Sequence, residues 1–163
     1  MNKSASKDLY DLVSDFEVAM LVTHNAKALH ARPMAIAHLD IDGFITYLVT
    51  DINSVKVDEI KANPHVLLTF QGPRKFASVN GELIIVQDRE LIESMWKDIW
   101  KVWFPLGKTD PGIALLKFTA HEGEFWDNAG MQAIKYVYSA AKALIACTRP
   151  EADKERHSKV TLK

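Results

Sequence analysis

The chain has 163 residues, of which 48% are hydrophobic and 25% are charged, an ordinary composition for one domain with a buried core. Its formal net charge of -1 excludes a general attraction to nucleic acid or to anionic membranes. The single cysteine, Cys147, excludes an intramolecular disulfide, and no stretch reaches the roughly 18 apolar residues of a membrane span. We therefore expect one soluble, cytoplasmic domain that covers residues 1–163.

Hydrophobic periodicity predicts short strands interrupted by short helices. Asp42-Gly43 predicts a hairpin turn, and Asn63-Pro64 ends a helix because the residue before a proline leaves helical geometry. In chain order, the predicted elements are a helix at 5–16, strands at 17–24, 28–39 and 44–50, a helix at 54–62, strands at 65–71 and 76–87, a helix after residue 88, strands at 114–119 and 124–127, a helix at 133–147 and a short strand at 159–162.

The helix after residue 88 is predicted from its cap and its apolar face. Asp88 is a good N-cap, and Phe104-Pro105 ends the helical pattern. Trp96, Trp100 and Trp103 lie at helical spacing. Such a cluster is more typical of core or dimer packing than of a surface that stacks on a ligand. The apolar face consists of Ile92, Met95, Trp96, Ile99 and Trp103.

The order of these elements favours an antiparallel, mainly β fold. About seven strands are predicted, and tight turns join most of them. No regular βαβ alternation is present, which argues against a Rossmann fold. A bend is expected at Gly81 in the long 76–87 strand. The number of strands alone does not distinguish a closed barrel from an open sheet.

Lys56 conflicts with the helix that carries it. It lies in the first turn of the 54–62 helix, where the helix dipole is positive and a cation is unfavourable. A bound anion removes the conflict, because N–H groups at a helix start, the Ser54 hydroxyl and the ammonium together form a phosphate site. Thr50, at the end of the preceding strand, adds a hydroxyl. A solvated surface lysine is the alternative, and spacing alone does not decide between the two.

An arginine and a proline interrupt the apolar strand at 28–39. Proline lacks a ladder donor, so Arg32-Pro33 is expected at a sheet edge or beside a ligand. Alternation predicts one small apolar face in the core and one mixed face for binding or subunit contact; an edge arginine that discourages aggregation is the alternative. The predicted core face consists of Leu29, Ala31, Pro33, Ala35, Ala37 and Leu39, and the mixed face of His30, Arg32, Met34, Ile36 and His38.

The other candidate residues predict no specific chemistry. The six histidines lack metal-ligand spacing, so no metal site is expected. Ser54 is not flanked by nucleophile-elbow glycines, and the chain has no Walker loop and no GxGxxG. Trp126 lies in a short aromatic strand where core packing is the default, although a tryptophan near a barrel rim can also cover a flat ring. The catalytic residues therefore stay unknown.

The two conflicts lie in segments that resemble a known family. The segments are Leu29–Met34 (LHARPM), residues 44–50 (FITYLVT), and Ser54–Ile60 (SVKVDEI) followed by Asn63-Pro64. Together they resemble the pyridoxamine 5'-phosphate oxidase-like FMN-binding split barrels. Elements similar to those of the general stress protein branch follow at Trp103–Pro105, Asp110-Pro111 and Phe125–Asp127. The resemblance covers nearly the whole chain.

The resemblance implies a mainly β fold with flanking helices (α+β), a six-stranded antiparallel split β-barrel. It also implies a homodimer with FMN, or alternatively FAD, at the subunit interface. By position, Arg32, Pro33 and Met34 would run beside the isoalloxazine and the ribityl-phosphate. The ribityl chain and phosphate would lie along Val49, Thr50, Ser54 and Lys56. Trp126 would contribute to the site of the partner subunit.

The chain differs from the true pyridoxamine phosphate oxidases of this family at three places. Their lysine five positions after the arginine is replaced by Ala37, and their glutamine on the strand before the barrel glycine is replaced by Phe76. Their C-terminal arginine and histidine pattern is not recognisable, and the chain ends in a short tail with Lys159 and Lys163. Phosphate binding should therefore depend on fewer charges, and vitamin B6 oxidation is not expected.

The resemblance leaves three functions open. The first is an FMN-dependent oxidoreductase that acts on an unknown small molecule, in which the flavin supplies the hydride chemistry. The second is a non-catalytic flavin-binding stress protein, acting as a carrier, buffer or redox sensor. The third is a split barrel that binds another ligand, such as haem or a different nucleotide. A flavin absorption spectrum of the purified protein would exclude the third.

Overall fold

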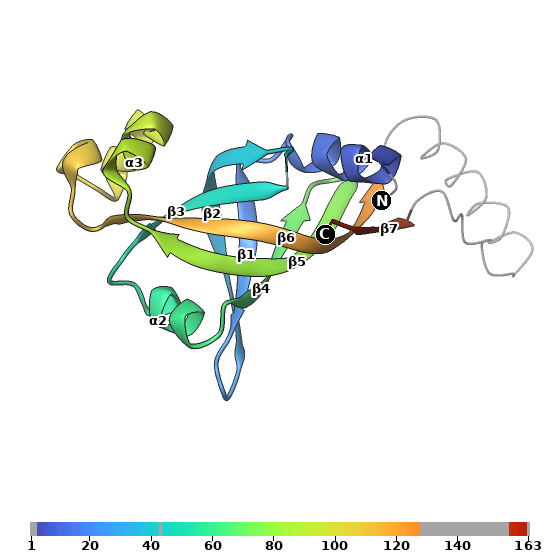
Figure 1. Cartoon of the computed structure of the whole chain (residues 1–163), viewed down its shortest axis with the longest axis horizontal. Coiled ribbons are helices and arrows are strands. Elements are labelled where there is room, and N and C mark those ends of the chain that lie inside the picture. Colours follow the sequence, from blue (N-terminus) through green and yellow to red (C-terminus); the bar gives the residue numbers. More distant parts are fainter. Residues whose placement is uncertain (1–2, 43, 128–156, 163) are drawn as a thin grey trace, which may run out of the picture.

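The computed structural model describes residues 3–42, 44–127 and 157–162 (Figure 1). Its helices are α1 (Lys3–Val13), α2 (Val55–Ala62) and α3 (Arg89–Met95), with two 3-10 helices, η1 (Asp98–Val102) and η2 (Gly107–Thr109). Its strands are β1 (Val18–His24), β2 (Leu29–Asp40), β3 (Ile45–Asp51), β4 (His65–Gln71), β5 (Lys75–Val86), β6 (Ile113–Asp127) and β7 (His157–Thr161). The predicted helix at 133–147 lies outside the described residues. No described helix is long and apolar enough to cross a membrane.

Six strands close into an antiparallel barrel. Their order is β3-β2-β1-β4-β5-β6, and β3 also pairs with β6, from Ile45↔Thr119 to Asp51↔Ile113. This last pairing closes the ring and confirms the six-stranded barrel over the open sheet. The strand expected in the tail is present as β7, which pairs with β6 beyond the end of β3.

β6 is one long strand where two were predicted. The separation into strands at 114–119 and 124–127 is wrong, because β5 pairs with β6 from Leu115 to Asp127. A register shift between Asn80 and Gly81 bends the pair without ending it, at the place where the bend was expected. A Cβ atom at Gly81 would lie 2.3 Å from the Thr119 carbonyl oxygen, so the close approach of the two strands requires glycine.

The two faces of β2 are largely the reverse of those predicted. Met34 and Ile36 are buried in the barrel core, whereas Leu29 is 71% exposed. Alternation defines two faces but does not say which one points inward. The face with small apolar side chains was predicted to be the core face, and this prediction is wrong for most of the strand. A register shift after Ile36 then changes the alternation, so that Ala37 is buried in a different cluster. The exposed members of the predicted core face are Leu29, Ala31 and Pro33.

The helix predicted after residue 88 ends early. The Asp88 carboxylate caps it as predicted, by accepting a backbone hydrogen bond at 3.0 Å, but α3 ends at Met95 and a 3-10 helix follows. A 3-10 helix has 3.0 residues per turn instead of 3.6, so an apolar face at α-helical spacing does not continue through it. Ile92 and Trp100 are buried, while Ile99 is 65% exposed. The single continuous apolar face is therefore wrong.

Two apolar clusters hold these parts together. The barrel core is closed at one end by α1, which contributes Leu9, Leu12 and Val13. The second cluster joins the barrel to residues 88–112, which we call the lobe and which lies at the other end of the barrel in Figure 1. It consists of Ile92, Trp100 and Phe104 from the lobe and Ala37, Val49, Ile113 and Leu115 from the strands. The lobe is thus fixed beside β2 and β3.

Candidate functional site

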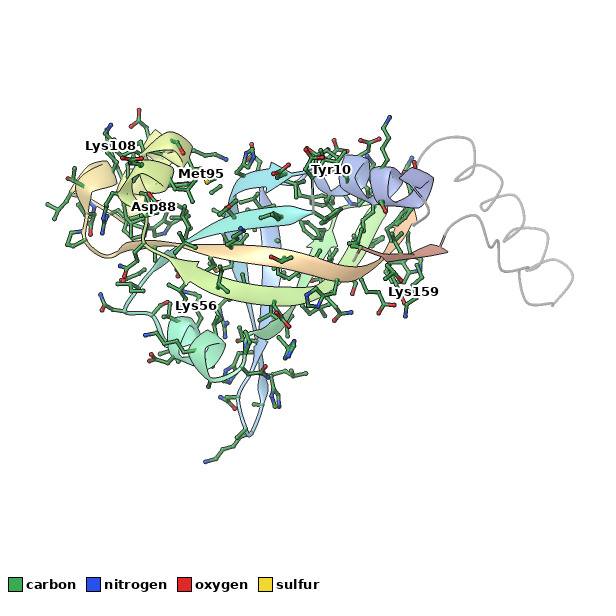
Figure 2. All side chains as sticks on the ribbon, viewed as in Figure 1. Tyr10, Lys56, Asp88, Met95, Lys108 and Lys159 are labelled. Carbon is green, nitrogen blue, oxygen red and sulfur yellow. The ribbon has the colours of Figure 1, made fainter. Side chains whose placement is uncertain are left out.

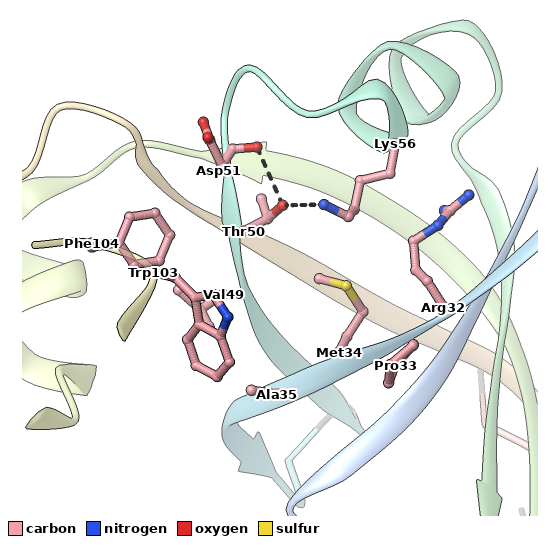
Figure 3. Close-up of a pocket in the computed structure, with 10 residues that line it drawn as sticks. All are labelled: Arg32, Pro33, Met34, Ala35, Val49, Thr50, Asp51, Lys56, Trp103 and Phe104. Atoms are coloured by element: carbon pink, nitrogen blue, oxygen red, sulfur yellow. Dashed lines mark hydrogen bonds between the residues drawn. The ribbon is translucent and has the colours of Figure 1, made fainter. Parts of the chain in front are cut away.

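A pocket opens where β2 and β3 separate. The two strands pair from Asp40↔Ile45 to Ile36↔Leu48, and beyond this point β2 continues along β1 while β3 continues along β6. A pocket of about 490 Å³ lies between the separated segments, with α2 and the lobe at its sides (Figure 3). The split in the barrel therefore creates the site.

Ten residues line this pocket, and six of them belong to the eight cofactor-binding residues predicted. The six are Arg32, Pro33, Met34, Val49, Thr50 and Lys56 (Figure 3). The four that were not predicted are Ala35, Asp51, Trp103 and Phe104. The structure thus brings together residues from β2, β3 and the start of α2, as the sequence predicts, and adds the lobe.

The end of the pocket beside α2 carries two cations and a hydroxyl group. Lys56 Nζ donates a hydrogen bond to Thr50 Oγ1 at 3.1 Å, and Arg32 rises from β2 close by (Figure 3). Burial, followed by the nearby charge of Arg32, lowers the pKa of Lys56. Two cations that share a partly desolvated space repel each other, and a bound anion would relieve that cost. We call this part of the pocket the cationic end.

Ser54 acts on the cationic end indirectly. It does not line the pocket, but its Oγ lies 3.3 Å from Thr50 Oγ1 and donates a hydrogen bond to the Asp51 carbonyl oxygen at 2.8 Å. The hydroxyl does not cap α2. Ser54 is therefore placed to orient Thr50, while direct contact with a ligand stays a prediction.

The tail lysine does not add charge to this pocket. Lys159 lies at the other end of the barrel from Lys56 (Figure 2), where β7 pairs with β6. Its Nζ lies 2.7 Å from an oxygen of Glu122. Among the described residues, the cations that line the pocket are therefore Arg32 and Lys56.

The opposite part of the pocket is apolar and partly aromatic. Met34, Val49 and Phe104 are buried there, and Trp103 is 59% exposed at the pocket mouth. Trp103 follows the last residue of η1, so its position depends on the early end of α3, which the sequence did not reveal. An apolar wall with one open side suits a flat ring system.

Trp126 does not reach this pocket within its own chain. It pairs with Phe76 and His157 near the end of β6, whereas the pocket residues of β3 pair with the beginning of β6, at Ile113–Leu115. Some dozen residues of extended strand separate the two places, which is on the order of 35 Å. A contribution from Trp126 to the pocket of a second subunit stays a prediction.

A buried carboxylate lies behind Arg32. Glu59 of α2 is 7% exposed, and its Oε2 accepts hydrogen bonds from Thr23 Oγ1 at 2.6 Å and from Arg32 Nη2 at 2.9 Å. Arg32 Nη1 donates to Thr23 Oγ1 at 2.7 Å, and His30 Nδ1 lies 2.5 Å from Glu59 Oε1. The hydrogen bond from Thr23, with those from His30 and Arg32, outweighs burial and lowers the pKa of Glu59 to about 2. The sequence gives no sign of this cluster, because Thr23 and Glu59 are 36 positions apart.

A second hollow of about 550 Å³ does not have the same character. It is lined by the acidic side chains of Asp15 and Glu17, and no cation is among its lining residues. An anion would be repelled there. Among the described residues, no group of three histidine, cysteine, aspartate or glutamate side chains could hold a metal ion.

A closed antiparallel barrel whose ladder splits between β2 and β3 defines a split β-barrel. The sequence profile described as pyridoxamine 5'-phosphate oxidase like matches residues 4–151, and the chain belongs to this family. Among curated proteins, Protein bli-3 of Neurospora crassa is 28% identical over 129 residues. The match covers 70% of this chain and 62% of that protein, so the chain spans less than two thirds of its relative.

Solved structures share the fold. A protein related to general stress protein 26, of the pyridoxinephosphate oxidase family, from Clostridium acetobutylicum has a TM-score of 0.68 at 23% identity, over 78% of this chain and 91% of that chain. A general stress FMN/FAD binding protein from Xanthomonas citri has a TM-score of 0.68 at 24% identity, over 79% of this chain and 92% of that chain. The expected fold, a six-stranded antiparallel split β-barrel with flanking helices, is confirmed.

Glu59→Gln is expected to flatten the loss of stability in acid. The folded-state pKa of Glu59, about 2, lies below the ordinary value of 4.5, so its contribution is complete above pH 4.5 and is lost as the pH falls toward 2. A shift of this size corresponds to about 3 kcal/mol. Urea denaturation at a series of pH values measures the free energy of unfolding, and the wild-type value should fall more steeply than that of E59Q.

The control for this experiment is Glu82→Gln. Glu82 forms an exposed pair with His65, so E82Q should follow the wild-type curve. If the free energy of unfolding of wild type and of E59Q fell equally steeply in acid, Glu59 would not be held ionised by its three partners.

Proposed function

We propose that this chain binds FMN in the pocket between β2 and β3. The observation that carries the proposal is that one pocket joins a cationic end, with Arg32, Lys56 and Thr50, to an apolar, partly aromatic wall. The phosphate would lie at the cationic end, and the isoalloxazine would lie along Pro33, Met34 and Val49. A structure with the same fold is that of an FMN/FAD binding protein, which supports a flavin and keeps FAD as the alternative.

The activity that we propose is a flavin-dependent oxidoreduction of a small molecule. When bound, the flavin would supply the hydride and electron chemistry. The chain's residues would bind and orient the flavin. The ten lining residues include no histidine and no cysteine. Their one carboxylate, that of Asp51, accepts the backbone N–H of Asn53 at 2.9 Å. The lack of an evident acid or base favours one alternative, a flavin carrier, buffer or redox sensor without turnover.

We also propose that the protein is a homodimer with the cofactor at its interface. Apolar side chains lie side by side on the outward face of β2, β1 and β4, since Val22 lies opposite Ala31 and Leu67, and Met20 lies opposite Pro33. Ala31 and Pro33 are exposed and the other three are partly exposed, and such an apolar patch is typical of a protein contact. Pro33 belongs to this face and also lines the pocket, so a second copy here would border the flavin.

The compartment that we propose is the cytoplasm, because the chain has a single cysteine and therefore no intramolecular disulfide.

Lys56→Ala is expected to weaken FMN binding about tenfold or more. A charge-assisted hydrogen bond contributes about 1.5–3 kcal/mol, and FMN has a phosphate for Lys56 to meet. Quenching of flavin fluorescence measures the dissociation constant. Lys61→Ala, an exposed lysine of the same helix, is the matched control and should bind FMN as the wild type does. An unchanged FMN affinity in K56A would refute the phosphate assignment.

The oxidoreductase and the carrier differ in turnover. We expect NADH or NADPH to bleach the visible absorbance of the bound flavin, and a small-molecule acceptor to restore it over many cycles. The same assay with an equal concentration of free FMN gives the background rate. A protein that binds flavin but cycles no faster than free FMN would favour the carrier.

Ala31→Glu is expected to convert the dimer into monomers and to weaken FMN binding with it. The substitution places a charge on the outward face of β2, where its counterpart would meet it across a two-fold axis. Sedimentation velocity measures the association. Ile84→Glu, at another exposed apolar position of the barrel, is the control and should stay dimeric. A monomeric wild type with full FMN affinity would contradict the interface site.

A further inference from the structure

Three groups from three elements form a closed hydrogen-bonded triangle behind the pocket. Arg32 of β2 donates to Thr23 of β1 and to Glu59 of α2, at 2.7 Å and 2.9 Å, and Thr23 donates to Glu59 at 2.6 Å. Each member contacts both of the others. We call Thr23 and Glu59 together the anchor. It fixes the end of the Arg32 side chain relative to β1 and α2 at once.

The anchor is more deeply buried than the arginine that it holds. Thr23 is 1% exposed and Glu59 is 7% exposed, while the Arg32 side chain is 22% exposed. Neither anchor group can exchange its partner for water without opening the packing between α2 and the barrel. The second carboxylate oxygen of Glu59 is also used, by His30. The anchor is therefore rigid, and Arg32 is the member with access to the pocket.

The bonds of Arg32 to the anchor leave part of its guanidinium for a ligand. Both use the terminal nitrogens Nη1 and Nη2, and neither uses the Nε–H donor. A guanidinium has five N–H donors in a fixed plane, so holding one edge determines the direction of the other. The Glu59 charge also balances that of Arg32, which allows Arg32 and Lys56 to lie at the same end of the pocket.

We propose that Thr23 and Glu59 are positioning residues, which hold the Arg32 guanidinium by its terminal edge so that its remaining N–H donors meet the phosphate of the bound flavin. This inference depends on the proposed function, in which FMN occupies the pocket. It assigns to Glu59 no contact with the ligand. The anchor acts before binding, by removing the freedom of a long side chain that the ligand would otherwise have to order.

The test compares two buried threonines, because each can be changed to valine with almost no change of shape. Thr23→Val removes one corner of the triangle, while Thr46→Val removes a hydroxyl that is 1% exposed and has no hydrogen-bond partner among the described residues. The probes are FMN and riboflavin, which lacks the phosphate. We expect T23V to bind FMN about three- to tenfold more weakly, with riboflavin affinity unchanged. T46V should match the wild type for both ligands, and T23S should recover FMN affinity.

Two further variants separate positioning from a structural role. Arg32→Lys keeps the charge but cannot hold the anchor with one edge and the phosphate with another, so it should lose FMN affinity and not riboflavin affinity. In an Arg32→Gln background, adding T23V should cause no further loss, because the anchor then has nothing to position. R32K also decides the question if T23V does not fold.

The outcomes are distinct. A wild type that shows no preference for FMN over riboflavin overturns the proposed phosphate site itself. A wild type that prefers FMN, with T23V or R32K equally selective, overturns the positioning role and leaves the site intact. An equal loss of FMN and riboflavin in T23V also overturns it, because a general disturbance of the barrel would then explain the result.

Discussion

The separation of β2 from β3 determines where every other part of the site lies. Each strand has two edges, and each gives one of them to a continuous partner, β1 for β2 and β6 for β3. The pairing of the two strands therefore ends at Ile36↔Leu48, next to the register shift between Ile36 and His38. A proline at position 33 is acceptable here, because β2 pairs with β3 only from Ile36 onward, so the ladder to β3 needs no donor at Pro33. The strand pairing thus creates an opening in a barrel that is otherwise closed.

The lobe is attached at the point of divergence. Lys97 Nζ donates a hydrogen bond to the carbonyl oxygen of Ile36 at 2.9 Å, and Ile36 is the first residue of β2 that pairs with β3. The buried Trp100 packs the lobe against Ala37 and Val49 close by. These contacts bring the following two aromatic residues, 103 and 104, to the pocket. The segment between β5 and β6 therefore supplies one wall of a site whose other walls come from the first half of the chain.

The sequence predicted the parts of the site that depend on short-range order. Thr50, Ser54 and Lys56 lie within one strand, one turn and the start of one helix, so local rules place their side chains near each other. Glu59 is only three residues further along, but its role depends on a threonine from β1 and an arginine from β2, which meet it through packing. No periodicity rule reveals such a contact.

The fold shows the same limit. Strand positions and turns follow from alternation and from Gly, Pro and Asp residues, and most were predicted within a few residues. The direction of each β2 face could not be predicted, because it depends on where the barrel interior lies. The end of α3 at Met95 could not be predicted either. The 3-10 helix that follows α3 buries Trp100 against the strands, and a helical pattern in the sequence does not contain this packing.

Charge balance connects the anchor to the pocket. Arg32 is paired with Glu59, and the pKa of Lys56 is lowered by burial and by Arg32 and raised by Asp51 and Glu59. The two cations and two carboxylates balance each other as a group, but among the described residues the hydrogen-bond partner of Lys56 is the neutral hydroxyl of Thr50. An anion placed between Lys56 and Arg32 would supply the missing partner without disturbing the buried pair. Because such an anion binds the folded state alone, it would also raise the free energy of unfolding. At anion concentrations above the dissociation constant, this increase would grow with the logarithm of the concentration.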